Sequence, residues 1–201
     1  MDLRNLIGPH LDLARLSKDL DELGHSGRLW SVHQWTRGDM AKLWDATKGT
    51  KPLTLDDFVP PSAAPLAEVI HHGKNSLPAH NFFQKRFCKP KDPEAKDMLV
   101  GFNYQTWAAA TGPGYFIAHP SSDAGDAGCV DIDYTMIPKE KPDAWPPIEP
   151  NSARLGRFVY YGMVDVMHGI SSHVSIGRAR KKHGWMNAWF VLVREDPQPS
   201  S

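Results

Sequence analysis

Short segments in which apolar and polar residues alternate follow one another from about residue 80 to the end of the chain. In the clearest of them Val130, Ile132 and Tyr134 alternate with Asp131 and Asp133. A period of two places successive side chains on opposite faces of a β-strand. The alternation therefore predicts that most of this chain folds as a sheet.

The segments that fit a strand are short and closely spaced, and they lie at 81–87, 99–107, 115–119, 130–136, 157–166, 173–179 and 189–193. The gaps between them leave no room for crossover helices, so we expect antiparallel pairing. Strands in this arrangement favour a strongly bent sheet or a barrel over alternating strand–helix units.

The region before residue 66 has a helical pattern instead. Four leucines at spacings of three and four share one face of a predicted helix: Leu13, Leu16, Leu20 and Leu23. Gly24 is a typical residue at a helix end, and Gly27 predicts that the chain stays irregular after it.

A second helix is predicted after Thr36, which has Asp39 three residues later, the spacing of a capping box. Its apolar face would consist of Met40, Leu43 and Trp44. The pair Thr54 and Asp57 repeats the cap spacing shortly before two consecutive prolines, which no helix can continue through.

We therefore predict an α+β fold in a single domain of residues 1–201. A helical N-terminal segment, residues 1–65, precedes an antiparallel β-barrel or strongly bent sheet in residues 66–196. Residues 138–150 contain five prolines and predict an extended surface arm whose anchor is Trp145.

Composition excludes several classes of function. Lys and Arg together number 23, as do Asp and Glu, so the formal net charge is zero. A general nucleic-acid binder needs a surplus of positive charge, and we expect no such partner. Two cysteines, Cys88 and Cys129, predict reduced thiols rather than a disulfide framework. We see neither a signal-peptide pattern nor a membrane-spanning apolar stretch, and expect a cytoplasmic protein with no membrane partner.

The densest polar cluster is the segment 71–76, which we predict to be a loop that combines acids, bases and hydrogen-bond donors. A solvated turn is the alternative. As a site, this segment and polar residues of the neighbouring strands would hold the polar end of a ligand, through His71, His72, Lys74, Asn75, Lys85, Arg86 and Tyr104.

We expect no metal and no cofactor, because the histidines lack the spacing of a metal-binding motif. His71 and His72 would need a folded-back loop to meet His80, and His168 and His173 are five residues apart.

Two further charged features have open interpretations. Asp131 and Asp133 share one side of a strand, where they would either flank a substrate or face solvent. The basic run at 178–183 would either bind an anion or form a charged, solubilising hairpin tip that turns at His183 and Gly184.

The run of short strands that ends in Gly-Met-Val-Asp at 162–165 and Phe-Val-Leu-Val-Arg-Glu at 190–195 resembles the lipocalin-like, or calycin-type, small β-barrel proteins, including uncharacterised bacterial members. This resemblance covers about the last 120 residues. It implies a closed antiparallel barrel whose mouth holds a small apolar ligand. The Gly-x-Trp signature of classical lipocalins is absent, and no functional residue is transferred.

The leading functional hypothesis is intracellular binding of a small, largely apolar ligand with a polar end in a barrel cavity. One alternative is a small-molecule isomerase, lyase or hydrolase, with His71 or His72 as general base and Lys74 or Tyr104 as electrostatic stabiliser. Another is a structural or interaction module whose Pro-rich arm docks on a partner or on a second copy, giving a homodimer.

Overall fold

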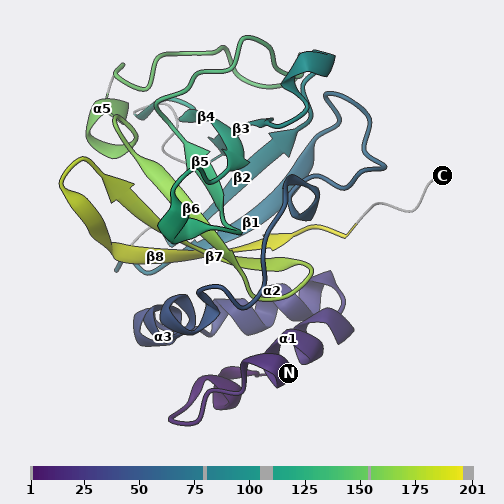
Figure 1. Cartoon of the computed structure of the whole chain (residues 1–201), viewed down its shortest axis with the longest axis vertical. Coiled ribbons are helices and arrows are strands. Elements are labelled where there is room, and N and C mark those ends of the chain that lie inside the picture. The colour runs from purple at the N-terminus through teal and green to yellow at the C-terminus, as the bar shows by residue number, and fades with distance from the viewer. Residues whose placement is uncertain (1, 79–80, 105–110, 154, 197–201) are drawn as a thin grey trace.

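The chain changes from helices to strands at residue 69, and the strands form a barrel that stands on the helices (Figure 1). This computed structural model describes residues 2–78, 81–104, 111–153 and 155–196. The α-helices are α1 (Leu13–Glu22), α2 (His25–His33), α3 (Arg37–Thr47) and the short α5 (Gly156–Val159). Single 3-10 turns lie at Arg4–Ile7, Leu55–Asp57, Pro93–Ala95 and Ala124–Asp126.

Eight antiparallel strands pair in sequence order and close into a barrel when β1 pairs with β8. The strands are β1 (Val69–Asn75), β2 (Phe82–Cys88), β3 (Leu99–Tyr104), β4 (Tyr115–Pro120), β5 (Val130–Asp133), β6 (Val164–Gly169), β7 (Val174–Lys181) and β8 (Gly184–Arg194). The predicted antiparallel barrel is thus confirmed, and closure leaves no open edge in it.

The predicted capping residues begin their helical turns as expected. The side chain of Thr36 accepts a hydrogen bond from the backbone of Asp39, whose side chain accepts one from Thr36, so both halves of the capping box form at α3. The same box forms at Thr54 and Asp57. Helix α1 begins at Asp12, whose side chain accepts a hydrogen bond from the backbone of Arg15.

The prediction of an irregular segment after Gly24 was wrong. Gly24 is the N-cap of a further helix, α2, and Gly27 lies inside it. A Cβ at Gly27 would approach Cδ2 of Leu23 to 3.3 Å, so the small residue lets the two helices turn closely. Glycine at this position allows a close approach between two helices. Its low helix propensity led to the prediction of a break.

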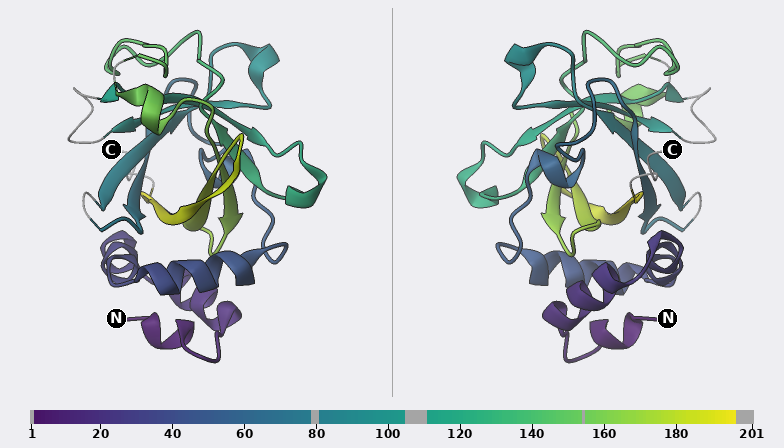
Figure 2. Two further views of the ribbon diagram at one scale, coloured as in Figure 1. Left: turned by 90° about the vertical axis from the view of Figure 1, so that its left-hand side faces the viewer. Right: turned by 90° about the vertical axis from the view of Figure 1, so that its right-hand side faces the viewer.

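Helices α2 and α3 cover the outer face of β7 and β8, and α1 lies beneath them (Figures 1 and 2). The buried residues that join the two layers are apolar on both sides: Leu16, Leu20, Val32, Trp35, Met40 and Leu43 from the helical segment, and Val166, Val174, Ile176, Val191 and Val193 from the strands. The stretch 190–193 of β8 is therefore apolar on both faces, because Val191 and Val193 meet the helices while Phe190 and Leu192 face the lumen. None of the described helices is long and apolar enough to cross a membrane.

The Pro-rich arm covers a second part of the outer surface, over β3 and β4. Trp145 is buried, and its ring lies 4.7 Å from Phe102 and 6.4 Å from Tyr115 between centroids. Its Nε1 donates a hydrogen bond of 2.5 Å to Glu68. The prediction that Trp145 anchors the arm is confirmed, because its side chain packs against the barrel of its own chain.

The strand predicted at 130–136 ends at Asp133, and residues 105–107 of the strand predicted at 99–107 lie outside the described residues. Two other predicted segments differ in kind from the structure. Residues 69–75 form strand β1 rather than a polar loop, because β2 on one side and β8 on the other supply backbone hydrogen bonds to it. Residues 157–166 are a strand only from Val164 onward: α5 and a turn at Gly162, with φ +66°, come first. Glycine adopts this left-handed backbone conformation without strain, so the chain can turn at Gly162 between α5 and β6.

Phenylalanine rings lie directly on glycines of the neighbouring strand inside the barrel. The cross-strand pairs are Gly73–Phe83, Gly101–Phe116 and Gly177–Phe190. A Cβ at Gly101 would lie 2.2 Å from Cε2 of Phe116. Each missing side chain thus makes room for a ring, so the interior is filled without spreading the strands.

Gly101→Ala tests this packing. We expect the free energy of unfolding to fall by about 1–3 kcal/mol, because the new methyl group must displace the ring of Phe116 in a closely packed core. Urea denaturation measures it. Gly38→Ala, on α3 in open surroundings, should leave stability unchanged or raise it by up to about 1 kcal/mol. Equal effects of the two substitutions would contradict the assigned packing.

Candidate functional site

A lysine and an aspartate form an ion pair inside the barrel. Nζ of Lys85 lies 3.0 Å from Oδ2 of Asp165, and both side chains are more than nine-tenths buried. Lys85 is on β2 and Asp165 on β6, which are diametrically opposite in a ring of eight strands. The ion pair therefore bridges the lumen from wall to wall.

Two more polar side chains complete this cluster, which we call the lumen cluster: Lys85, Asn103, Tyr134 and Asp165. Lys85 donates hydrogen bonds to Oδ1 of Asn103 at 3.0 Å and to the hydroxyl of Tyr134. The amide of Asn103 donates to the carbonyl oxygen of Gly114 at 3.1 Å. Together with Asp165, these residues give each of the three N–H groups of the ammonium a hydrogen-bond acceptor in the barrel wall.

Aromatic rings surround the ammonium group of Lys85. Its Nζ lies between 4.9 and 5.7 Å from the ring centroids of Phe83, Phe116, Tyr134 and Phe190. The negative faces of such rings attract a cation. They also exclude water, which makes the single carboxylate of Asp165 the principal balancing charge.

Burial shifts the protonation equilibria of the cluster. The pKa of Lys85 is lowered, because burial penalises the ammonium ion more than the carboxylate of Asp165 supports it. The pKa of Tyr134 is raised well above 10 by burial and by the nearby Asp165 carboxylate. Tyr134 therefore remains a protonated hydroxyl at neutral pH, able to donate a hydrogen bond.

The lumen cluster is the floor of a cavity at one end of the barrel. This mouth cavity has a volume of about 350 Å³. Its remaining walls are mainly apolar and come from β1, β2, β7, β8 and the segment around α5: Asn75, Leu77, Phe83, Phe158, Val159, Tyr160, Met163, Ala179, Met186, Ala188, Trp189 and Phe190. Small residues such as Ala179 and Ala188 leave the space that the rings do not fill.

On the other side of the lumen cluster the barrel is solid. Moving two residues along their strands from the cluster leads to Phe87, Ile132 and Met167, all of which are fully buried. The far end is closed by Phe58, which packs against Phe87. The open space of the barrel is thus confined to its mouth.

A second surface cavity, of about 370 Å³, lies near the far end between residues 55–65 and 89–99. Its charged residues include Lys89, Lys91 and Asp92, which lie between β2 and β3. It lacks a buried charge, so the mouth cavity is the better candidate site.

Two of the seven residues predicted to bind a ligand line the mouth cavity: Lys85 and Asn75. His71 also points into the barrel but lies on the closed side, where Nε2 is 2.9 Å from the carbonyl oxygen of Phe58. Burial lowers the pKa of His71 to about 3, so the ring is neutral and donates this hydrogen bond.

The other predicted residues of β1 point outward. Nε2 of His72 lies 2.6 Å from Oε1 of Glu195. Lys74 donates hydrogen bonds to the carbonyl oxygens of His33 and Trp35, at 2.5 and 2.7 Å, and so satisfies the C-terminus of α2. These side chains join the barrel to the chain segments packed on it.

Arg86 and Tyr104 lie together on the outer surface of β2 and β3. The guanidinium of Arg86 is 4.1 Å from the ring centroid of Tyr104 and forms an ion pair with Glu68 at 3.1 Å. Tyr104 is about half exposed. The structure does not bring His71, His72, Lys74 and Tyr104 together, and His80 lies outside the described residues.

The remaining sequence candidates also occupy the outer surface. Asp131 accepts a hydrogen bond from Ser121 at 3.1 Å, whereas Asp133 pairs with His119 at 3.9 Å, so the two carboxylates have separate partners. The predicted hairpin at Gly184 is confirmed, and its Arg180 forms ion pairs with Asp123 and Asp126.

Cys88 and Cys129 are both free and buried. Burial is the main cause that raises their pKa values, to about 12 for Cys88 and about 11 for Cys129. Thiols with such pKa values stay protonated at neutral pH, which argues against a nucleophilic role.

Sequence reasoning missed three members of the lumen cluster. Asn103 is on β3, Tyr134 directly follows β5 and Asp165 is on β6, and nothing in their local sequence links them. A signal does exist at Lys85, which shares its strand face with Phe83 and Phe87. A charge flanked by two apolar residues on one strand face indicates an inward-pointing ion that needs a partner across the lumen.

Searches of this chain against family models, curated proteins and solved structures return no match.

The importance of the ion pair can be tested with Lys85→Met, which leaves Asp165 buried without a counter-charge. We expect the free energy of unfolding to fall by about 3–5 kcal/mol. The double variant Lys85→Met with Asp165→Asn should be more stable than Lys85→Met alone, because the unpaired charge is gone. Chemical denaturation of both, with the exposed Lys42→Met as control, measures this. A double variant that is no more stable than Lys85→Met alone would refute the coupling between the two charges.

The buried neutral His71 predicts a pH dependence of stability. Unfolded His71 takes up a proton near pH 6.5, whereas in the native state its pKa is about 3. The unfolded state thus binds more protons in this window, so stability falls as pH drops from about 6.5 to 3. By linkage this single group contributes up to about 5 kcal/mol of that loss. His71→Gln should flatten the stability profile between these pH values.

His119→Gln is the matched control with the opposite sign. The pKa of His119 is raised, chiefly by the neighbouring carboxylate of Asp133. Its contribution is therefore complete below pH 6.5 and is lost as pH rises through the raised pKa. This variant should lose most stability at acidic pH. If both variants alter the profile in the same direction, the assignment of His71 as a buried neutral group is wrong.

Proposed function

We propose that this protein binds a small, largely apolar molecule with a polar end in the mouth of the barrel. The observation that carries the proposal is the buried ion pair of Lys85 and Asp165 at the floor of an otherwise mainly apolar cavity of about 350 Å³. Ligand pockets commonly combine apolar walls with a few placed polar groups. The apolar body of the ligand would contact the wall, and the polar end would reach the floor.

The hydrogen bonds of the floor favour a ligand that donates one. The ammonium of Lys85 directs its hydrogen bonds to Asn103, Tyr134 and Asp165. Among the described residues these contacts use Oδ2 of Asp165, and Oδ1 takes part in no hydrogen bond. A hydroxyl group on the ligand would satisfy Oδ1, whereas a ligand carboxylate would bring a second negative charge to Asp165.

The alternative functions have less support. No histidine stands among the described residues that line the mouth cavity, so the general base proposed from sequence has no counterpart there. Trp145 of the Pro-rich arm is buried against its own barrel. A lipocalin-like mode of binding remains part of this proposal, and the closed eight-stranded barrel is compatible with it. A cytoplasmic location also remains a proposal, which two free, buried cysteines support.

A series of straight-chain alkanes, alcohols and carboxylates tests the proposal by displacement of an apolar fluorescent probe. We expect affinity to rise about fourfold for each added methylene until the cavity is full. At equal length the alcohol should bind more tightly than the carboxylate or the alkane. The enclosed apolar volume sets the first trend, and Asp165 sets the second.

The control variants place a ring inside or outside the cavity. Ala179 lines the cavity beside Asp165, its partner on the adjacent strand, so Ala179→Phe fills the cavity and should weaken binding of the best alcohol roughly tenfold or more. Ala124→Phe, in an exposed turn, should leave binding unchanged. Failure of the whole series to displace the probe, or equal binding by both variants, would reject the mouth cavity as the binding site.

A further inference from the structure

Three side chains with metal-ligating atoms meet on the outside of the barrel. They are His25, the first residue of α2, His72 on β1, and Glu195, which follows β8. One ligand atom from each lies within 4.8 Å of the other two. We propose that His25, His72 and Glu195 bind a divalent transition-metal ion of the Zn²⁺ class.

The closure of the barrel brings two of these ligands together. His72 pairs across the seam with Val193 of β8, and the backbone N–H of Glu195 donates a hydrogen bond of 2.9 Å to the carbonyl oxygen of Ile70. This register places the side chains of His72 and Glu195 on the same outer face, with Nε2 and Oε1 2.6 Å apart. Their positions are thus fixed by backbone pairing.

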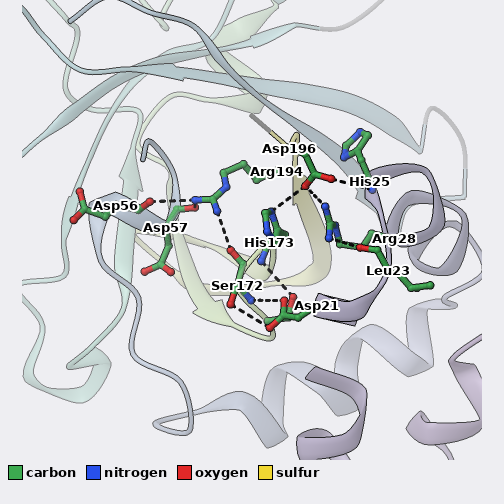
Figure 3. Close-up of polar contacts among 11 residues, drawn as sticks. Asp21, Leu23, His25, Arg28, Asp56, Asp57, Ser172, His173, Arg194 and Asp196 are labelled. Carbon is green, nitrogen blue, oxygen red and sulfur yellow. Dashed lines mark hydrogen bonds and ion pairs between the residues drawn. The ribbon is translucent and has the colours of Figure 1, made fainter. Parts of the chain in front are cut away.

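Helix α2 brings the third ligand. The backbone N–H of His25 donates a hydrogen bond of 3.2 Å to Oδ2 of Asp196, which also pairs with Arg28 (Figure 3). The imidazole rings of His25 and His72 are 5.2 Å apart between centroids. Within the described part of the chain, Nδ1 of His25 is buried without a hydrogen-bond partner. A buried nitrogen in this state calls for an explanation, and a bound ion nearby supplies one.

The donor set and the spacing suit zinc. Two imidazoles and one carboxylate are common zinc ligands, with bonds of about 2.0–2.2 Å. Ligand atoms of a tetrahedral ion with such bonds are about 3.3 Å apart. His72 and Glu195, now 2.6 Å apart, therefore separate slightly and His25 approaches them when the ion binds. The proton between Nε2 and Oε1 leaves when the ion binds.

Local charge also favours a cation. Glu195 contributes a negative charge, and the positive charge of the adjacent Arg28 is already paired with Asp196. The three ligands leave a fourth coordination position for water or another ligand. The side chains of His72 and Glu195 are 27% and 30% exposed, so this position has access to solvent.

The ion would join α2 to the seam where β1 meets β8. No metal-binding motif is visible in the sequence, because the three ligands are separated by 47 and 123 positions. The site is independent of the mouth cavity, since His72 points away from the lumen. Metal binding should therefore occur whether or not the cavity takes a ligand.

The test uses the full chain without an added histidine tag, freed of metal by chelator and dialysed against Zn²⁺ alone or Co²⁺ alone. We expect one Zn²⁺ per chain, visible absorption of bound Co²⁺, and a rise in the midpoint of thermal unfolding with Zn²⁺. His25→Ala and His72→Ala should weaken binding roughly tenfold or more, and Glu195→Gln should weaken it as well.

His183→Ala, at the exposed hairpin tip, is the control and should bind like the unaltered chain. His25→Gln, which cannot act as an imidazole ligand, covers the case in which His25→Ala fails to fold, and circular dichroism verifies folding of every variant. Absence of saturable Zn²⁺ binding would overturn the proposal. So would equal binding by the His25 variants, the His72→Ala variant and the unaltered chain.

Discussion

The ion pair between Lys85 and Asp165 is the interaction on which the organisation of this barrel depends. Its two residues lie on strands that face each other across the lumen, so the pair forms only when all eight strands have closed in register. Removing two charges from water costs several kcal/mol for each, and their attraction offsets that cost only when geometry and hydrogen bonding are good. Asn103 and Tyr134 supply the hydrogen bonds. A pair of apolar side chains would stabilise the barrel without the cost of burying charge. We therefore connect the ion pair with ligand binding.

The pair also divides the lumen into a filled half and an open half. On the closed side, the ring of Phe116 rests on Gly101 of the neighbouring strand, and Phe58 packs at the end of the barrel. On the open side, alanines occupy positions where larger residues would complete the core. Outer layers pack against the barrel on two sides: the helices cover β7 and β8, and Trp145 covers β3 and β4.

Local chemistry made much of the fold predictable from the sequence. Capping boxes at Thr36 and Thr54 depend on residues three positions apart, and the alternation from Val130 to Tyr134 depends on one strand alone. The lumen cluster was not predictable in this way, because Lys85 and Asp165 are 80 positions apart and meet only through strand order and register. Gly27 shows the converse error: its helix is stabilised by packing on the barrel, which no local propensity measures.

The segment 71–75 shows why polar density in a sequence does not by itself identify a site. Once the segment is a strand, its residues separate by parity: His71 enters the closed half of the lumen, whereas His72 and Lys74 face outward toward the helices and the C-terminal segment. One shift of register would exchange these environments. The neighbours of β1 prevent it, since β2 and β8 pair with both of its edges. Polar side chains that are neighbours in this segment are therefore divided between the barrel interior, the contact with the helices and the outer surface. Each of them interacts with partners that are far away in the sequence.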